Sequence, residues 1–387
     1  MSIYLDYNAT TPLDERVLEV MLPYLREQFG NPSSGYRLGR TARAAMDTAR
    51  EQVATLVNAH PSQVVFTSGG TEANNLAIKG LAGRVAPGHL AISAVEHDSV
   101  RAAAGLLQQQ GWSLETVGVD AQGRLDLESM RAAIAGMPPG AARLVAVMLA
   151  NNETGVIHDV ASVSGQARES GAAVLVDAVQ AIGKIPVDIA ALGASLMSLS
   201  AHKIYGPKGA GALIVDKAMD MQPMLHGGGH EKGRRAGTEN VAAIVGFGKA
   251  AELALAALET RTSQMRRLRE HLEQRLLAEM PALCVFGQQA QRLPNTSFFA
   301  LPGVDGETLL MSLDQAGLAV SSGSACSTGE VEPSHVLMAM GVDPALARGA
   351  IRVSMGKDTR RDEVDQFVDG FKQQLQTLQR FASVACA

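Results

Sequence analysis

Short apolar runs, rich in β-branched residues, alternate with longer amphipathic stretches up to about residue 250. Continuous apolar runs are typical of strands that are buried on both faces, and helical patterns between them indicate crossovers in a parallel sheet. We therefore predict an α/β fold: a large domain over residues 15–250, with a mostly parallel sheet flanked by helices. The expected strands are 64–66, 90–93, 114–119, 144–149, 173–176, 196–199 and 212–215.

The pattern changes after Gly248, where one long helical stretch over 250–280 is followed by shorter strands and helices. This mixture indicates a smaller α+β domain, to which we assign residues 1–14 and 251–387. A helix expected over 13–29 is predicted to pack on that domain. The other elements expected there are strands over 283–286, 295–301, 318–322 and 351–355, and helices over 306–316, 334–340 and from residue 361.

Composition narrows the class of protein. Among 387 residues, 46% are hydrophobic and 19% are charged, which is the balance of a soluble globular chain with a sizeable core. The net charge of −5 argues against nucleic acid as a direct partner. We find neither a secretory signal nor an apolar run long enough to span a membrane, so we expect no membrane association and a cytoplasmic location.

Three predicted strands are followed by polar residues that suit a bound ligand. The run 67–75, Thr-Ser-Gly-Gly-Thr-Glu-Ala-Asn-Asn, precedes a helix, and its small residues and helix N-terminus favour an anion. Asp177 ends another strand, and Lys203 follows a third, where a lysine suits a Schiff base with an aldehyde cofactor.

Each of these matches has an ordinary alternative when it is taken alone. Thr71 and Asp177 could simply cap helices, and Lys203 could be a surface lysine in a Gly-Pro turn. The carboxyl ends of parallel strands share one edge of a sheet, where ligands bind in open α/β folds. The three candidate sites are therefore expected to converge at that edge, which makes the ordinary alternative less probable for each of them.

The chain has three cysteines, too few and too widely spaced for a disulfide framework or a zinc site, so we expect no resident metal. Cys326 lies in a run of small polar residues, Ser-Ser-Gly-Ser-Ala-Cys-Ser-Thr-Gly, which is typical of an accessible loop. Cys284 lies in an apolar strand and is expected to be buried and inert, and Cys386 lies near the end of the chain. Only Cys326 has a setting that suits a nucleophile.

Taken together, these segments resemble the fold-type-I enzymes that depend on pyridoxal 5′-phosphate (PLP), and more narrowly the class I cysteine desulfurases of the NifS/IscS type. The resemblance runs from residue 4 to about residue 356. Its most specific motifs are Ala-His-Lys-Ile-Tyr-Gly-Pro-Lys-Gly at 201–209, His-Gly-Gly-Gly-His at 226–230, Arg-Ala-Gly-Thr at 235–238 and Ser-Ser-Gly-Ser-Ala-Cys at 321–326. It implies an aminotransferase-like fold with a large cofactor domain and a smaller domain that carries the cysteine loop.

The resemblance also implies roles for particular residues. Lys203 would bond to the cofactor aldehyde and later move the substrate Cα proton, and His97 would stack on the pyridine ring and move protons. Asp177 would pair with the pyridine nitrogen, Gln180 with the phenolic oxygen, and Arg352, beside Asn152, with the substrate carboxylate. The phosphate would be held by Gly70, Thr71, Ser200 and His202, with Thr238 supplied by a neighbouring subunit, so the resemblance implies a homodimer.

The implied reaction converts L-cysteine to L-alanine, with the sulfur taken by Cys326 as a persulfide for an acceptor such as an iron–sulfur cluster scaffold protein. Cys326 could also ligate a nascent cluster transiently. No lysine or arginine adjoins Cys326, so we expect its deprotonation to depend on the bound substrate or on His97. The residues after it, Ser-Thr-Gly-Glu, resemble the nitrogen-fixation branch slightly more than the housekeeping one.

Other readings stay open at this point. An aminotransferase of the same fold would need a 2-oxo acid and not Cys326, and a selenocysteine lyase would spare cysteine. A scaffold without activity would not bind PLP, so measuring the bound cofactor separates it from the enzymes.

Overall fold

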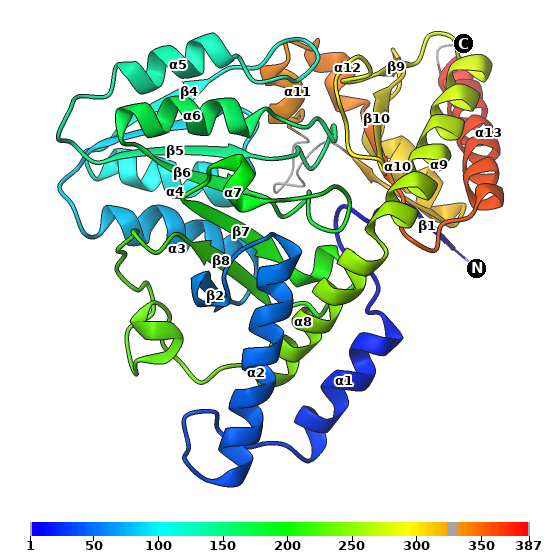
Figure 1. Ribbon diagram of the computed structural model, residues 1–387. Coiled ribbons are helices and arrows are strands. Elements are labelled where there is room, and N and C mark those ends of the chain that lie inside the picture. Colours follow the sequence, from blue (N-terminus) through cyan, green and yellow to red (C-terminus); the bar gives the residue numbers. More distant parts are fainter. Residues whose placement is uncertain (1, 323–331, 386–387) are drawn as a thin grey trace.

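The computed structural model describes residues 2–322 and 332–385, with side chains up to residue 378. Its central sheet has seven strands in the order β2-β8-β7-β6-β5-β3-β4 (Figure 1). All neighbours run parallel except β8, which is antiparallel to both β2 and β7. The prediction of a mostly parallel sheet is confirmed. The strands are β2 (Val64–Thr67), β3 (His89–Ser93), β4 (Ser113–Val117), β5 (Arg143–Met148), β6 (Ala173–Asp177), β7 (Leu196–Ser200) and β8 (Gly211–Val215).

Helices cover both faces of this sheet because six of its seven strands are buried almost throughout; only the edge strand β4 is largely exposed. On one face, α3 (Gly70–Ala82) and α4 (Asp98–Gln109) bury their apolar side chains against the strands. The opposite face packs against α2 (Arg37–Leu56), α5 (Leu127–Ala135), α6 (Val160–Ser170) and α8 (Val241–Ala256). The short α7 (Ile189–Leu192) joins this second layer.

A second sheet of four strands lies beside the first, in the order β12-β13-β10-β9 (Figure 1). Its strands are β9 (Cys284–Val285), β10 (Thr296–Ala300), β12 (Ser321–Ser322) and β13 (Ile351–Ser354). The N-terminal β1 (Ile3–Tyr4) pairs in parallel with β11 (Leu318–Ala319). The helices of this part are α9 (Leu258–Glu279), α10 (Gly306–Gln315), α11 (His335–Ala339), α12 (Pro344–Arg348) and α13 (Arg361–Ala385). The domain boundary near residue 250 stays a prediction.

The single helix expected over 250–280 is wrong, because α8 and α9 are separate helices that meet at an angle of 71°. They serve different cores. Gly248 of α8 packs so closely on α2 that a Cβ there would lie 2.6 Å from the Ala49 Cα. By contrast, α9 packs beside α13 against the second sheet. The Ala- and Leu-rich composition is helical throughout, so only the two packing partners reveal the bend.

The packing predicted for the N-terminal helix is also wrong. This helix, α1 (Glu15–Arg26), packs on α8 rather than on the second sheet (Figure 1). Its apolar face carries Val17 and Met21, and Met21 lies over Gly246, where a Cβ would sit 2.6 Å from the Met21 Sδ. The close approach at a glycine fixes α1 to the large core.

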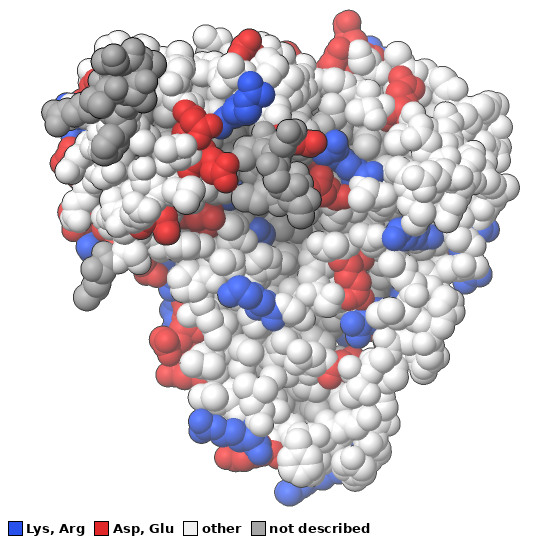
Figure 2. Space-filling model, turned by 180° about the vertical axis from the view of Figure 1, so that it is seen from behind, with Lys and Arg blue, Asp and Glu red and all other residues white. Residues whose placement is uncertain are grey.

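Cys284 is exposed, which corrects the prediction that it is buried. The alternation of β9 places its neighbours Leu283 and Val285 inside and the thiol outside. Within the part of the chain that is described, no single helix is long and apolar enough to cross a membrane, and α8 with α9 passes that test only as a bent pair. On the face shown in Figure 2, acidic and basic side chains are interspersed, and no continuous basic area is visible outside the grey atoms.

Candidate active site

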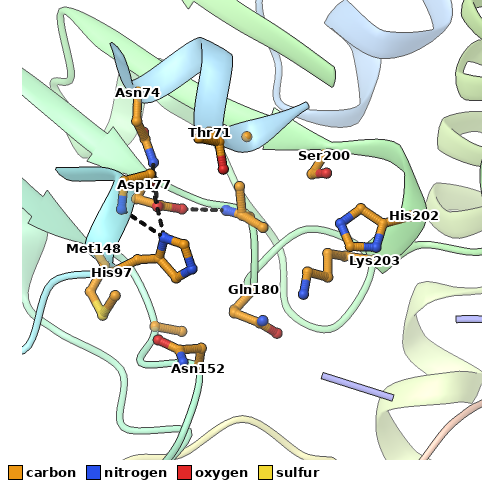
Figure 3. A pocket seen from close by; sticks show the side chains of 14 residues that line it. Thr71, Asn74, His97, Met148, Asn152, Asp177, Gln180, Ser200, His202 and Lys203 are labelled. Carbon is orange, nitrogen blue, oxygen red and sulfur yellow. Dashed lines mark hydrogen bonds between the residues drawn. The ribbon is translucent and has the colours of Figure 1, made fainter. Parts of the chain in front are cut away.

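A cavity of about 220 Å³ lies at the carboxyl ends of the parallel strands. This is the edge at which ligands bind in open α/β sheets. Figure 3 shows Asn74, His97 and Asp177 at one end of the cavity, and Ser200, His202 and Lys203 at the other. Its lining contains most of the residues predicted from the sequence: Gly70, Thr71, His97, Asn152, Asp177, Gln180, Ser200, His202 and Lys203. The convergence expected at the sheet edge is therefore observed.

Asp177 closes one end of the cavity at the last residue of β6. Its Oδ1 accepts from the Val179 N–H at 3.0 Å, and its Oδ2 accepts from the Asn74 Nδ2 at 2.8 Å. Two donors hold a nearly buried carboxylate in one orientation. Such a group offers negative charge to a cationic ring nitrogen.

His97 is the N-cap of α4, and it also lines the cavity. Its Nδ1 accepts from the Ser99 N–H at 3.1 Å. A ring nitrogen that accepts from a backbone donor carries no proton, so the proton of neutral His97 sits on Nε2. Asn74 donates to the Ser99 Oγ at 2.9 Å and so links this helix cap to Asp177.

Lys203 lies at the other end, at the close of the short 3₁₀ turn Ala201–Lys203 that follows β7. Its Nζ donates to the carbonyl oxygens of Asn8 at 2.5 Å and Ala9 at 2.7 Å. Burial, followed by the positive charge of Arg352, lowers the pKa of Lys203 to about 8. A larger share of neutral amine is thus present near neutral pH than for an exposed lysine, as a nucleophile requires.

The anion cradle predicted at 67–75 forms the N-terminus of α3. Gly70 admits no side chain, because a Cβ there would lie 2.7 Å from the Val179 Cγ2. The buried Ser200 hydroxyl has no hydrogen-bond partner among the described residues. A helix N-terminus and an unsatisfied hydroxyl, in one cavity with an amine and a carboxylate, fit a phosphorylated pyridine aldehyde.

Arg352 approaches from the second sheet, on β13. Its Nη1 donates to the Asn152 carbonyl at 3.0 Å, and its Nη2 donates to the Asp6 Oδ1 at 2.7 Å. Asn152 lines the cavity, so the guanidinium lies next to the cavity without being part of its lining. Its buried Nε has no partner among the described residues.

Two predicted residues are not placed in this cavity. Thr238 is exposed and lines a separate hollow with Arg235 and Glu239, so its role in a neighbouring subunit stays a prediction. Cys326 lies outside the described residues. Across the described ranges 2–322 and 332–385, no cluster of three potential metal ligands occurs.

Sequence reasoning missed three residues that build the site: Asn8, Asn74 and Lys184. Asn74 lies inside the predicted cradle, but nothing in the sequence shows that it faces Asp177. Lys184 is the one charged residue in the run Ala-Val-Gln-Ala-Ile-Gly-Lys-Ile-Pro, and a lysine in such a setting was a usable signal. Asn8 could not be found, because its partners lie 144 to 346 residues away.

The comparisons with known proteins agree with this geometry. Residues 3–367 match the model of the aminotransferase class-V family. A cysteine desulfurase of Trichormus azollae is 44% identical over 95% of this chain and 91% of its own. Among solved structures, a NifS-like protein superposes with a TM-score of 0.90 at 36% identity, over 97% of this chain and 100% of that chain. A structure titled SspA in complex with cysteine has a TM-score of 0.81 at 31% identity, over 92% and 99% of the two chains. The chain belongs to the aminotransferase class-V family and, within it, to the cysteine desulfurases.

Proposed function

We propose that this chain is a PLP-dependent enzyme that converts L-cysteine to L-alanine and takes the sulfur onto Cys326 as a persulfide. The observation that carries the proposal is the placement of Lys203 across one cavity from Asp177, with the helix N-terminus of α3 beside them. An amine of lowered pKa, a fixed carboxylate and an anion site match the aldehyde, ring nitrogen and phosphate of PLP.

Different residues of the cavity would bind different parts of the cofactor. Lys203 would hold the aldehyde carbon, Asp177 the ring nitrogen and Gln180 the phenolic oxygen, with His97 against the ring. Bound PLP supplies an electron sink that makes the substrate Cα proton acidic. The phosphate would rest on the α3 N-terminus and on polar side chains of the cavity, namely Gly70, Thr71, Ser200 and His202. Thr238 of the partner subunit would complete it, which makes the active unit a homodimer.

The chain's own groups then handle protons and charge. Lys203 would be the base that takes the substrate Cα proton, since its carbonyl partners Asn8 and Ala9 keep its Nζ at the cavity wall. Arg352 binds the substrate carboxylate with its remaining N–H groups. His97 carries its proton on Nε2 when neutral, so it acts first as a proton donor in the cavity.

The sulfur transfer balances without an added oxidant. The Cys326 thiolate forms a bond to the substrate sulfur, and the Cβ–S bond breaks with its electron pair on the carbon side. Cβ gains a proton and becomes the methyl group of alanine. The sulfur is oxidised as that carbon is reduced, so one thiol and one cysteine give one persulfide and one alanine. An iron–sulfur scaffold protein would accept the sulfur, and we place this reaction in the cytoplasm.

Incubation of the PLP-loaded protein with L-cysteine and dithiothreitol tests the proposal. Sulfide and alanine should appear in equal amounts, and their formation from L-cysteine should not require a 2-oxo acid. Amino transfer that depends on a 2-oxo acid, without sulfide, would show an aminotransferase instead. Turnover of L-selenocysteine with no turnover of L-cysteine would show a selenocysteine lyase.

A further inference from the structure

Lys184 is a buried lysine next to the cavity that the proposed reaction does not use. The residue is 5% exposed, and its Nζ donates to the Gln180 Oε1 at 2.7 Å and to the Asn8 Oδ1 at 2.8 Å. Both partners are amide oxygens rather than carboxylates. Burial, followed by the charges of Lys203 and Arg352, holds the pKa of Lys184 well below its ordinary value. An amine without an anionic partner is costly to bury, which calls for a reason beyond packing.

The contacts of Gln180 supply that reason. Its Oε1 faces Lys184, and its Nε2 donates to the Asn8 carbonyl oxygen at 3.0 Å. Turning the amide over would place Nε2 against the donor Nζ and Oε1 against the carbonyl oxygen. The contact between Oε1 and the Asn8 carbonyl oxygen would then be repulsive, and the Lys184 Nζ would lose one of its two amide-oxygen acceptors, so the amide has one favourable orientation.

Asn8 cannot turn over to relieve that arrangement, because its own amide is fully engaged. Its Oδ1 also accepts from the Asn295 Nδ2 at 3.0 Å. Its Nδ2 donates to the Asn152 carbonyl at 3.2 Å and to the Thr296 Oγ1 at 2.9 Å. Asn295 and Thr296, beside and on the second sheet, therefore fix which way the Asn8 amide faces. Asn8 in turn holds the Lys184 Nζ, and Lys184 donates to Gln180.

We propose that Lys184 is a positioning residue that holds the Gln180 amide with an N–H, not the carbonyl, toward the cavity. Gln180 lines the cavity, and Nε2 has a second N–H beyond the one given to Asn8. That N–H would meet the phenolic oxygen of PLP, an anionic acceptor, whereas the reverse orientation would set two oxygens against each other. The inference rests on the proposed function, since it concerns how the same site receives PLP.

Lys184→Met in the PLP-loaded protein tests the inference, because methionine fills similar space without a donor. A donor to the phenolate lowers the affinity of the neighbouring imine nitrogen for its proton, so the pH midpoint of the visible absorbance band should rise by about one unit when it is lost. The dissociation constant of PLP should rise by about tenfold, the value of one hydrogen bond. Lys372→Met, on the exposed surface of α13, is the matched control and should change neither quantity.

Gln180→Leu should raise the midpoint equally, and adding Lys184→Met to it should raise the midpoint no further, because both act through one hydrogen bond. Additive shifts, or a Lys184→Met variant with an unchanged midpoint and a lower melting temperature, would overturn the proposal. If Lys184→Met does not fold, Gln180→Glu tests the contact on which the proposal depends: it keeps a partner for Lys184 and presents only oxygen to the cavity. An unchanged midpoint in Gln180→Glu also overturns the proposal. A wild-type protein without any PLP band would instead contradict the proposed function itself.

Discussion

Asp6 and Arg352 form an ion pair between the N-terminal segment and β13, with the Arg352 Nη2 2.7 Å from the Asp6 Oδ1 across 346 residues of sequence. The Asn152 carbonyl accepts from Nη1 on the other side. Two acceptors on two branches hold the guanidinium plane in place before any substrate arrives. Pre-oriented charge of this kind favours a carboxylate that must be bound in one direction.

Replacing Arg352 with lysine should therefore weaken substrate binding more than turnover. A lysine keeps the charge but cannot reach two acceptors and the substrate together. We expect the KM for L-cysteine to rise by about 10- to 100-fold, with a smaller fall in kcat. Initial rates of alanine formation measure both values. Arg348→Lys, on the exposed side of α12, should leave KM unchanged, and an unchanged KM in Arg352→Lys would rule out the carboxylate role.

Lys203→Ala should abolish the visible absorbance band of the lysine-bound cofactor and lower desulfuration by at least about a thousandfold, because nucleophile and base are lost together. Absorbance spectra after reconstitution with PLP and sulfide assays provide the two measurements. Lys217→Ala, in the exposed turn after β8, serves as the control. A persistent band in Lys203→Ala would place the cofactor on another amine.

The pKa of about 8 for Lys203 makes a prediction about pH. Only the neutral amine attacks an aldehyde, so the rate at which the apoprotein captures PLP should rise with pH and level off above about pH 8, well below the range of an exposed lysine. Stopped-flow absorbance measures this rate. Arg352→Gln removes a positive charge that favours the neutral amine, so its midpoint should move to higher pH. A wild-type midpoint near pH 10 would contradict the prediction.

Cys326→Ala should retain PLP and its visible band, since the proposed cofactor contacts come from other residues of the cavity, but should release no sulfide. The thiol is the only group in the proposed scheme that accepts sulfur. Cys284→Ala is a close control, because Cys284 is an exposed thiol on β9, and it should keep full activity. Mass spectrometry should find the added sulfur on Cys326 in the wild type. Normal sulfide release by Cys326→Ala would end the persulfide proposal.

Glu153 predicts a dependence of stability on pH. Burial raises the pKa of its carboxyl group to about 7, although the Ser334 hydroxyl donates to it. The folded state then binds this proton more tightly than the unfolded state, so stability falls as pH rises from about 4.5 to about 7. Glu153→Gln should stabilise the protein at pH 8 by on the order of 1 kcal/mol and should have little effect at pH 4.5.

Urea unfolding at both pH values and one protein concentration measures this difference. Glu128→Gln, on the exposed surface of α5, controls for the loss of one carboxylate. Equal effects of Glu153→Gln at pH 4.5 and pH 8 would show that the carboxyl group titrates normally.

The sequence predicted every strand of the large sheet, and six of the seven are apolar on both faces and so stand out from the helices between them. It also predicted the cavity, since Asp177, Lys203 and the α3 N-terminus all follow strands and must meet at one edge. Residues such as Asn8 and Lys184 escaped because a lone polar side chain acquires its meaning only from tertiary neighbours. The bend between α8 and α9 was not predicted for a similar reason. Helix propensity depends on the residues of the helix and not on which core the helix packs against.

The contacts of Asn8 have a consequence for the order in which parts of the newly made protein become functional. Its side chain and main chain meet Lys203 and Gln180 of the large sheet, and Asn295 and Ser354 of the second sheet. During synthesis Asn8 leaves the ribosome long before Asn295 and Ser354, which follow it by 287 and 346 residues. The large sheet can form while the chain is still growing, but the wall that supports Lys203 cannot. Newly made chains should therefore gain the capacity to capture PLP only after the C-terminal part has been released and has closed on the N-terminal segment.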